Sequence, residues 1–122
     1  MMKMGFATLI ALTSITSAAT AECRTIGFRF YVTQNDSVST TGVSTGGSAC
    51  TMYFRSLNTV RYTSRAIASP PAHGSLSEVG AFRFRYRPSA GFKGVDRYAI
   101  RICGSGLSGS GCSTLTYNIT VQ

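Results

Sequence analysis

The sequence predicts an all-β protein, an antiparallel β-sandwich of about seven short strands. Residues 82–87 alternate strictly between aromatic and cationic side chains, which is the pattern of a strand with one apolar and one charged face. Turns rich in glycine and proline separate this segment from its neighbours. After residue 21, no segment shows the 3.6-residue apolar period of a helix. Together these observations favour two packed sheets.

The strands are expected in chain order as follows. Six segments have the alternation or composition of strands: Arg24–Val32, Ala49–Phe54, Val60–Ala68, Ala81–Arg87, Asp96–Cys103 and Ser113–Val121. Residues 34–48 are rich in Ser, Thr and Gly, and we expect a long connection there with a short edge strand near residues 37–40. Residues 74–76 are expected to form a short extension before a turn at 77–80. Residues 104–111 are expected to form a flexible hairpin loop.

The first 21 residues predict a cleaved signal peptide. Lys3 supplies the positive start, residues 6–15 are mostly apolar, and Ala19-Thr20-Ala21 fits a small-x-small cleavage site. The apolar run is shorter than the about 20 residues that a membrane span needs. A buried N-terminal helix is the alternative, but no later helical pattern offers it a packing partner. Residues 22–122 then form a single exported domain, periplasmic or secreted, with no membrane span in the mature form.

Four cysteines lie in the predicted mature chain, which indicates two disulfides in an oxidising compartment. Strand parity places Cys103 and Cys112 on the same outward face of neighbouring strands, which favours that pair and leaves Cys23 with Cys50. The alternative Cys50–Cys103 bridge resembles that of antibody domains and requires Cys103 to face the core. A lipid anchor on Cys23 is not expected, because the bulky Glu22 precedes it. A zinc site is not expected either, because the chain has no CxxC and one histidine.

The charge balance is strongly basic. The chain has a formal net charge of +8, and without Lys3 it keeps 11 Lys and Arg against 4 Asp and Glu, which is +7; ten of these cations are arginines. Such a surface favours anionic partners such as nucleic acid, acidic polysaccharide, phospholipid or lipopolysaccharide. The alternative is that the charge only keeps a β-protein soluble and protects its sheet edges.

Arg83, Arg85 and Arg87 are the candidate ligand-binding residues. Side chains on one face of a strand repeat about every 6.6–6.8 Å, a spacing that suits successive charges of an anionic polymer. The alternative is a solvated outer face without a ligand. Specific nucleic-acid binding is not expected, because stacking on bases requires exposed aromatic rings and the aromatic residues of this segment alternate inward.

The motifs of residues 70–102 resemble a known family. Pro71-Ala72-His73-Gly74, then Tyr86-Arg87-Pro88, then Gly91-Phe92-Lys93-Gly94-Val95-Asp96-Arg97-Tyr98 are similar to motifs of bacterial Ig-like and cadherin-like domains of exported proteins. The resemblance implies an Ig-like sandwich with Greek-key connections, and it places Arg97 and Arg101 on the sheet opposite Arg83. The N-terminal half matches less well and lacks the acidic calcium loops of many relatives. Such domains commonly serve as spacers or adhesion modules in tandem arrays.

The turn at residues 91–98 is expected to be structural. Gly91 and Gly94 permit backbone conformations that other residues avoid. Asp96 can accept hydrogen bonds from the amides of the turn, and Phe92 is expected to cover the end of the core. Tyr98 is expected to act like the tyrosine corner of Ig sandwiches.

The sequence does not indicate an enzyme, a cofactor or a metal site. Residues 104–109 match G-x-G-x-x-G, but a strand follows where a dinucleotide site needs a helix. His73 lies in a Pro/Gly turn without a Ser-His-Asp motif. The four carboxylates give little material for a glycosidase pair or a calcium cluster.

The expected function is therefore that of an exported non-enzymatic binding module for an anionic glycan or another envelope component. An alternative is a protein-interaction or structural subunit of a periplasmic or cell-surface assembly, acting through edge strands or the 104–111 loop. A third is a purely structural exported protein with no ligand.

Overall fold

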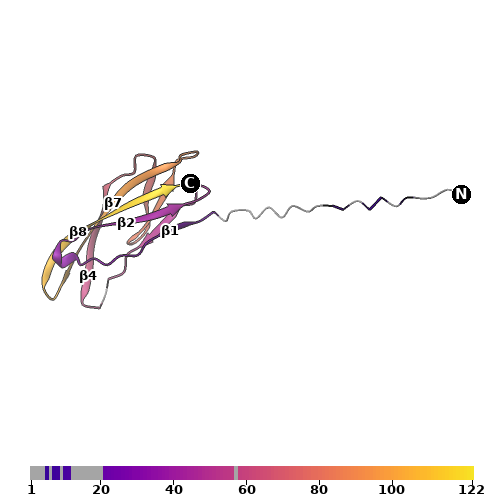
Figure 1. Ribbon diagram of the computed structural model, residues 1–122. Coiled ribbons are helices and arrows are strands. Elements are labelled where there is room, and N and C mark those ends of the chain that lie inside the picture. The colour runs from indigo at the N-terminus through magenta and orange to yellow at the C-terminus, as the bar shows by residue number, and fades with distance from the viewer. Residues whose placement is uncertain (1–4, 6, 9, 12–20, 57) are drawn as a thin grey trace.

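The computed structural model is all-β, as the alternation predicts (Figure 1). It describes residues 5, 7–8, 10–11, 21–56 and 58–122. A 3-10 turn, η1 (Val32–Gln34), is the one helical element among these residues. The strands are β1 (Cys23–Thr25), β2 (Ser37–Ser44), β3 (Cys50–Tyr53), β4 (Val60–Ser69), β5 (Gly74–Gly80), β6 (Arg83–Pro88), β7 (Gly94–Gly106) and β8 (Gly109–Val121).

The strands form two sheets. A five-stranded sheet has the order β1-β2-β8-β7-β4, and a three-stranded sheet has the order β3-β6-β5. All paired strands are antiparallel except β2 and β8, which run parallel over eight residue pairs. The chain passes from one sheet to the other between β2 and β3, between β3 and β4, between β4 and β5, and between β6 and β7.

The core lies between the two sheets and is built from the inward positions of each strand. Tyr86 of β6 stacks on Tyr98 of β7, with ring centres 4.9 Å apart, so the two sheets pack face to face. The buried apolar set is Val32, Cys50, Met52, Phe54, Phe84, Tyr86, Tyr98, Ala99, Ile100, Ile102, Leu115, Tyr117, Ile119 and Val121. The alternation of the predicted strands thus places one face of each in the core.

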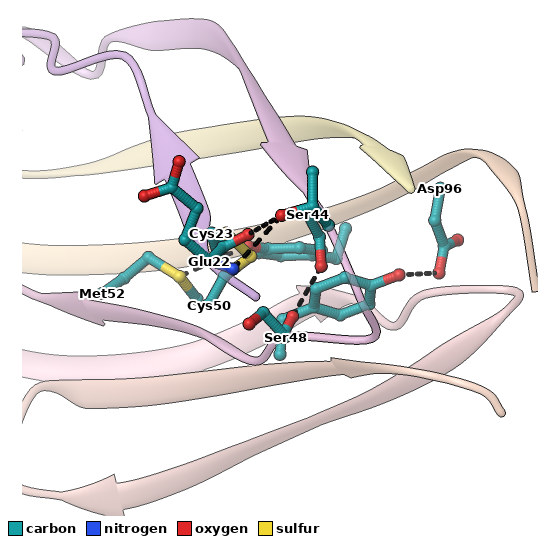
Figure 2. Close-up of a disulfide and its surroundings, with 10 residues drawn as sticks. Glu22, Cys23, Ser44, Ser48, Cys50, Met52 and Asp96 are labelled. Carbon is teal, nitrogen blue, oxygen red and sulfur yellow. Dashed lines mark hydrogen bonds between the residues drawn. A yellow bond between two sulfur atoms is a disulfide. The ribbon is translucent and has the colours of Figure 1, made fainter. Parts of the chain in front are cut away.

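Both predicted disulfides are confirmed. Cys103 and Cys112 lie directly opposite each other on β7 and β8, as strand parity predicts. Cys23 and Cys50 join β1 of one sheet to β3 of the other, and this bridge lies beside Ser44 (Figure 2). The Ser44 hydroxyl donates a hydrogen bond of 2.6 Å to the backbone carbonyl of Ser48. Two disulfides in a small β domain are compatible with an oxidising, extracellular or periplasmic location.

The first predicted strand, Arg24–Val32, is wrong beyond Thr25, where β1 ends. Pairing with β2 ends at Thr25, followed by one backbone bond from the Ile26 amide to the Thr41 carbonyl. Phe28 and Phe30 then turn toward the core and pack against its aromatic rings. Packing of these rings against the core therefore decides the conformation of the segment, although its local alternation favours a strand.

The predicted long connection at residues 34–48 contains the eight-residue strand β2, and β2 lies inside the sheet. Its core-facing residues are small: Thr40, Gly42 and Ser44 are buried. A Cβ atom at Gly42 would lie 2.8 Å from the Arg24 carbonyl oxygen and 2.9 Å from a methyl carbon of Ile119. Because the neighbouring strands approach so closely, only small side chains fit at these positions. The strand therefore has the Ser, Thr and Gly composition that is typical of a loop.

Two further boundaries differ from the prediction. The short extension at 74–76 is the start of β5, which pairs with β6 up to Gly80, so the turn lies at residues 81–82. The predicted flexible loop at 104–111 is largely paired: β7 and β8 continue to Gly106 and Gly109. A Cβ at Gly104 would lie 2.5 Å from the Arg61 carbonyl oxygen, so this glycine permits a close strand contact.

The predicted signal peptide lies mostly outside the described residues, including Lys3 and Ala19-Thr20. The described residues 5, 7–8 and 10–11 have no regular secondary structure. No helix in the described part of the chain is long and apolar enough to cross a membrane.

Candidate ligand-binding face

The arginine row lies on the outer surface of the three-stranded sheet. β6 is its central strand, and Phe84 and Tyr86 are buried beneath it. Arg83 and Arg87 are exposed and Arg85 is partly exposed, as the alternation predicts. A central strand has a neighbour on each side, so the row is flanked by residues of both β3 and β5.

The neighbours of the row follow from the strand register. Arg85 lies opposite Thr51 of β3 and Ser77 of β5. Arg87 lies opposite Ser75, and Arg83 lies opposite Tyr53. Hydroxyl groups therefore flank the cationic row on both sides. We call this surface the arginine face: Thr51, Tyr53, Arg55, Ser75, Ser77, Arg83, Arg85 and Arg87.

Tyr53 is the residue of this face that the sequence reasoning missed. Its side chain is 49% exposed, and the guanidinium carbons of Arg83 and Arg55 lie 4.9 Å and 5.1 Å from its ring centre. Attractive contacts between a cation and an aromatic ring hold the two arginines in place. The signal was present in the second predicted strand, where Thr51, Tyr53 and Arg55 alternate with the buried Met52 and Phe54.

No carboxylate forms an ion pair with the arginine face in the described part of the chain. Glu22 pairs with Arg24, and Glu78 pairs with Arg65 over 2.7 Å. Asp36 accepts a hydrogen bond from the Tyr31 amide, and Asp96 is buried. The cations of the arginine face are thus available to an external anion.

Arg97 and Arg101 lie on the other sheet, as expected. Both belong to β7 and are exposed, while Tyr98, Ile100 and Ile102 between and beside them are buried. Arg97 donates a hydrogen bond of 2.8 Å from Nε to Oδ1 of Asn118. The basic residues of β6 and β7 therefore form two separate surfaces on opposite sides of the core.

Asp96 of β7 binds both the 70–73 turn and Tyr86 of β6. Its carboxylate is 1% exposed and accepts hydrogen bonds from the Ala72, His73 and Arg97 amides and from the Tyr86 hydroxyl. The bond from Tyr86 is 2.7 Å long (Figure 2). Asp96 was expected to bind the amides of the 91–95 turn. Two of its amide donors come instead from the 70–73 turn, which the sheet packing brings beside it.

Burial and this carboxylate both act on Tyr86. Burial raises the pKa of Tyr86 most, and the hydrogen bond to Asp96 and its negative charge raise the pKa further. The phenol thus remains a hydrogen-bond donor to Asp96 under ordinary conditions. This arrangement fixes β6 to β7 across the two sheets.

The remaining predicted turn residues are structural. Gly91 and Gly94 have φ values of 79° and 137°, which other residues rarely adopt. Phe92 is partly buried against the core and stacks on His73, with ring centres 4.2 Å apart. The tyrosine-corner expectation for Tyr98 is wrong: its hydroxyl donates to the sulfur of Met52 over 3.2 Å, because the ring lies deep between the sheets.

No group of three or more His, Cys, Asp or Glu side chains able to hold a metal ion occurs among the described residues. Comparisons of the chain with protein-family models, with curated proteins and with solved structures gave no match. Proposals about function therefore rest on the geometry of this chain.

Proposed function

We propose that the protein is an exported, non-enzymatic module that binds an anionic glycan of the cell envelope through its arginine face. The observation that carries the proposal is the row Arg83, Arg85 and Arg87 beside the exposed Tyr53, with no carboxylate of the described residues paired to any of them. Guanidinium groups bind carboxylate, sulfate and phosphate oxygens in two-point fashion. Acidic polysaccharides and lipopolysaccharide repeat such groups along a chain.

The surroundings of the row favour a glycan over nucleic acid. Thr51, Ser75 and Ser77 offer hydroxyl groups that can exchange hydrogen bonds with sugar hydroxyls. The exposed ring of Tyr53 is covered by two guanidinium groups. Stacking along a nucleic-acid strand uses several free aromatic faces, and the arginine face offers a single ring that is already occupied.

The domain that presents this face is proposed to be an Ig-like sandwich with Greek-key connections, released by cleavage of residues 1–21. The orders β4-β7-β8 and β3-β6-β5 correspond to the C-F-G and B-E-D strands of Ig domains. The parallel addition of β2 to β8 extends that arrangement. An adhesion role in the periplasm or at the cell surface is consistent with two disulfides in a small domain.

Affinity chromatography of the mature protein on immobilised heparin tests the proposal. The triple variant R83S/R85S/R87S removes the row, and R61S/R97S/R101S removes the same charge from exposed positions of the opposite sheet. We expect the wild type and the opposite-sheet variant to elute at high salt and the row variant to elute at clearly lower salt. Equal elution of the two variants would show that net charge alone causes retention, and would contradict the proposal.

A matched set of probes separates the ligand classes. Retention on immobilised polygalacturonate, but not on neutral dextran, is expected for an acidic glycan site. Stronger, row-dependent binding to single-stranded DNA of equal charge would assign the face to nucleic acid instead. The alternative is a protein-interaction subunit acting through residues 104–111, which form a paired hairpin with a two-residue turn; the edge-strand form of that alternative is taken up below.

A further inference from the structure

The segment Gly27–Phe30 leaves the edge of the five-stranded sheet without joining the other sheet. The last contacts with β2 are made by Ile26, whose amide donates to Thr41 and whose carbonyl accepts from the Thr40 hydroxyl. The next anchored residue is Tyr31, whose amide donates to the Asp36 carboxylate over 2.7 Å. Among the described residues, no hydrogen bond joins the backbone of residues 27–30 to another segment.

Strand β3 faces this segment with an unpaired edge. β3 pairs with β6 on one side and has no strand neighbour on the other among the described residues. The Phe54 amide donates to the Phe82 carbonyl at the end of the β6 side. Because successive residues of a strand direct their backbone groups to alternate sides, Met52 and Phe54 face β6, and Thr51 and Tyr53 present N–H and C=O to the open side.

A recess lies between these two unpaired backbones. Its volume is about 330 Å³, and its walls are residues 25–28 on one side and 51–55 on the other. A second recess of about 390 Å³ adjoins it and shares the rings of Phe28, Phe30 and Tyr62 with it. These rings pack on one another, with Phe30 stacked 5.9 Å from Tyr62 and Phe28 set edge-on 5.6 Å from Tyr117. The floor is therefore aromatic and preformed.

Two arginines border the recess. Arg29 lies in the wall of the second recess, and Arg55 lines both. Both side chains belong to exposed residues, and neither forms an ion pair among the described residues. An occupant with carboxylates is therefore favoured by charge complementarity.

We propose that this recess binds an extended acidic peptide segment of a partner protein, which adds as a strand to the free edge of β3. Its backbone exchanges hydrogen bonds with Thr51 and Tyr53, as in other cases of strand addition. Its apolar side chains, at every second position, face the Phe28 and Phe30 rings. Its carboxylates lie on the outer side and meet Arg55 and Arg29. This site goes beyond the proposed glycan function: it shares Thr51, Tyr53 and Arg55 with the arginine face but does not use Arg83, Arg85 or Arg87.

A capped six-residue peptide in which Asp alternates with Phe, Val and Leu is the test ligand. Titration into the ¹⁵N-labelled mature protein should shift the amide signals of Thr51 and Tyr53 and slow their exchange with solvent. The same peptide with alternate N-methylated amides cannot donate to β3 and should bind about tenfold more weakly, because two backbone hydrogen bonds are lost. An isomer with its three Asp residues consecutive should lose binding as well. Equal binding of all three peptides, or no binding at millimolar concentration, would overturn the proposal.

Protein variants give an independent test. Thr51→Pro removes an amide that points to the open side and breaks no ladder bond with β6, whereas Thr51→Val keeps the amide. We expect about tenfold weaker peptide binding for Thr51→Pro and unchanged binding for Thr51→Val. If Thr51→Pro does not fold, R29E and R55E provide the test. Each must weaken binding of the Asp peptide and strengthen binding of the same peptide with Lys in place of Asp. A dimer of the unliganded protein that Thr51→Pro abolishes would assign the edge to a second copy, and would overturn the proposal. The row variant R83S/R85S/R87S must retain peptide binding, which separates peptide binding from glycan binding by the row.

Discussion

Arg83 holds its guanidinium carbon 4.9 Å from the centre of the Tyr53 ring, across the pairing of β6 with β3. Arg83 and Tyr53 are direct cross-strand neighbours, so the contact follows from the register of the two strands. It fixes one end of the arginine row on a rigid sheet. An arginine held in this way presents its charge without first having to order its side chain.

A double-mutant cycle measures this contact. Tyr53→Leu and Arg83→Ser, singly and together, should give a coupling of about 0.5–1 kcal/mol in the free energy of unfolding, the range for an exposed cation–ring contact. The same cycle with Arg87 in place of Arg83 is the control. Arg87 lies opposite Ser75 and beyond the paired residues of β3, so no coupling is expected. Equal coupling in both cycles would show that the contact has no specific role.

Tyr86→Phe should destabilise the fold by about 1–3 kcal/mol. The change removes the hydroxyl that donates to Asp96 and leaves one side of a buried carboxylate without that donor. Urea unfolding of the variant measures the loss. Tyr31→Phe is the control, because Tyr31 is 46% exposed and its change should alter the unfolding free energy by less than about 0.5 kcal/mol. A Tyr86→Phe protein as stable as the wild type would mean that the Asp96 network does not hold the sheets together.

The protein should lose stability steeply in alkaline solution. Burial raises the pKa values of Tyr86, Tyr98 and Tyr117 above the value near 10 of an unfolded chain. A raised folded pKa stabilises the protein below the unfolded pKa, and this contribution is lost as pH rises above 10. Each tyrosine then lowers the unfolding free energy by about 1.4 kcal/mol per pH unit.

Urea unfolding between pH 8 and pH 11.5 measures this loss. Tyr98→Phe is the informative variant, because it removes one titrating group and keeps the ring. We expect the decline above pH 10 to be shallower by about 1.4 kcal/mol per pH unit in Tyr98→Phe. If the slopes of variant and wild type coincide, Tyr98 ionises in the folded protein as readily as in the unfolded chain, against this account.

Gly104→Ala and Gly111→Ala should each destabilise the β7–β8 hairpin by about 1–3 kcal/mol, the usual cost of overpacking. Cβ atoms there would collide with the carbonyl oxygens of Arg61 and Val32, both of them backbone atoms that cannot rotate away. Gly80→Ala is the matched control, because the nearest atom to its Cβ would be 3.7 Å away. In thermal unfolding, Gly104→Ala and Gly111→Ala should have lower melting temperatures than Gly80→Ala. An unaffected Gly104→Ala protein would support the flexible-loop expectation and contradict the paired hairpin.

The parts of the fold that the sequence predicts are those where large side chains alternate. In β6, β7 and β8 most inward positions are aromatic or aliphatic, so burial decides the orientation of these strands, and the Cys103–Cys112 pair follows from parity alone. β2 could not be predicted from the sequence. Its neighbours lie so close that glycine, serine and threonine occupy it, and these residues show no alternation of large apolar side chains. Residues 26–31 show the opposite case. Their apolar alternation predicts a strand, but Phe28 and Phe30 pack against the core and the segment pairs with no strand.

The same distinction applies to the candidate sites. The outward direction of Arg83, Arg85 and Arg87 follows from one strand's own pattern. Tyr53 joins them only through the pairing of β3 with β6, which no local pattern specifies. The recess between residues 25–28 and 51–55 exists because these two segments do not pair as strands. The sequence of either segment alone does not indicate whether they pair.

The most direct test of glycan binding is a map of where the glycan lies. A heparin-derived hexasaccharide titrated into the ¹⁵N-labelled mature protein should shift the amide signals of β3, β5 and β6 around Thr51, Ser77 and Arg85. The signals of Arg61, Arg97 and Arg101 on the opposite sheet should move little. Shifts spread equally over both sheets, or centred on Arg97 and Arg101, would contradict the assignment of ligand binding to the arginine face.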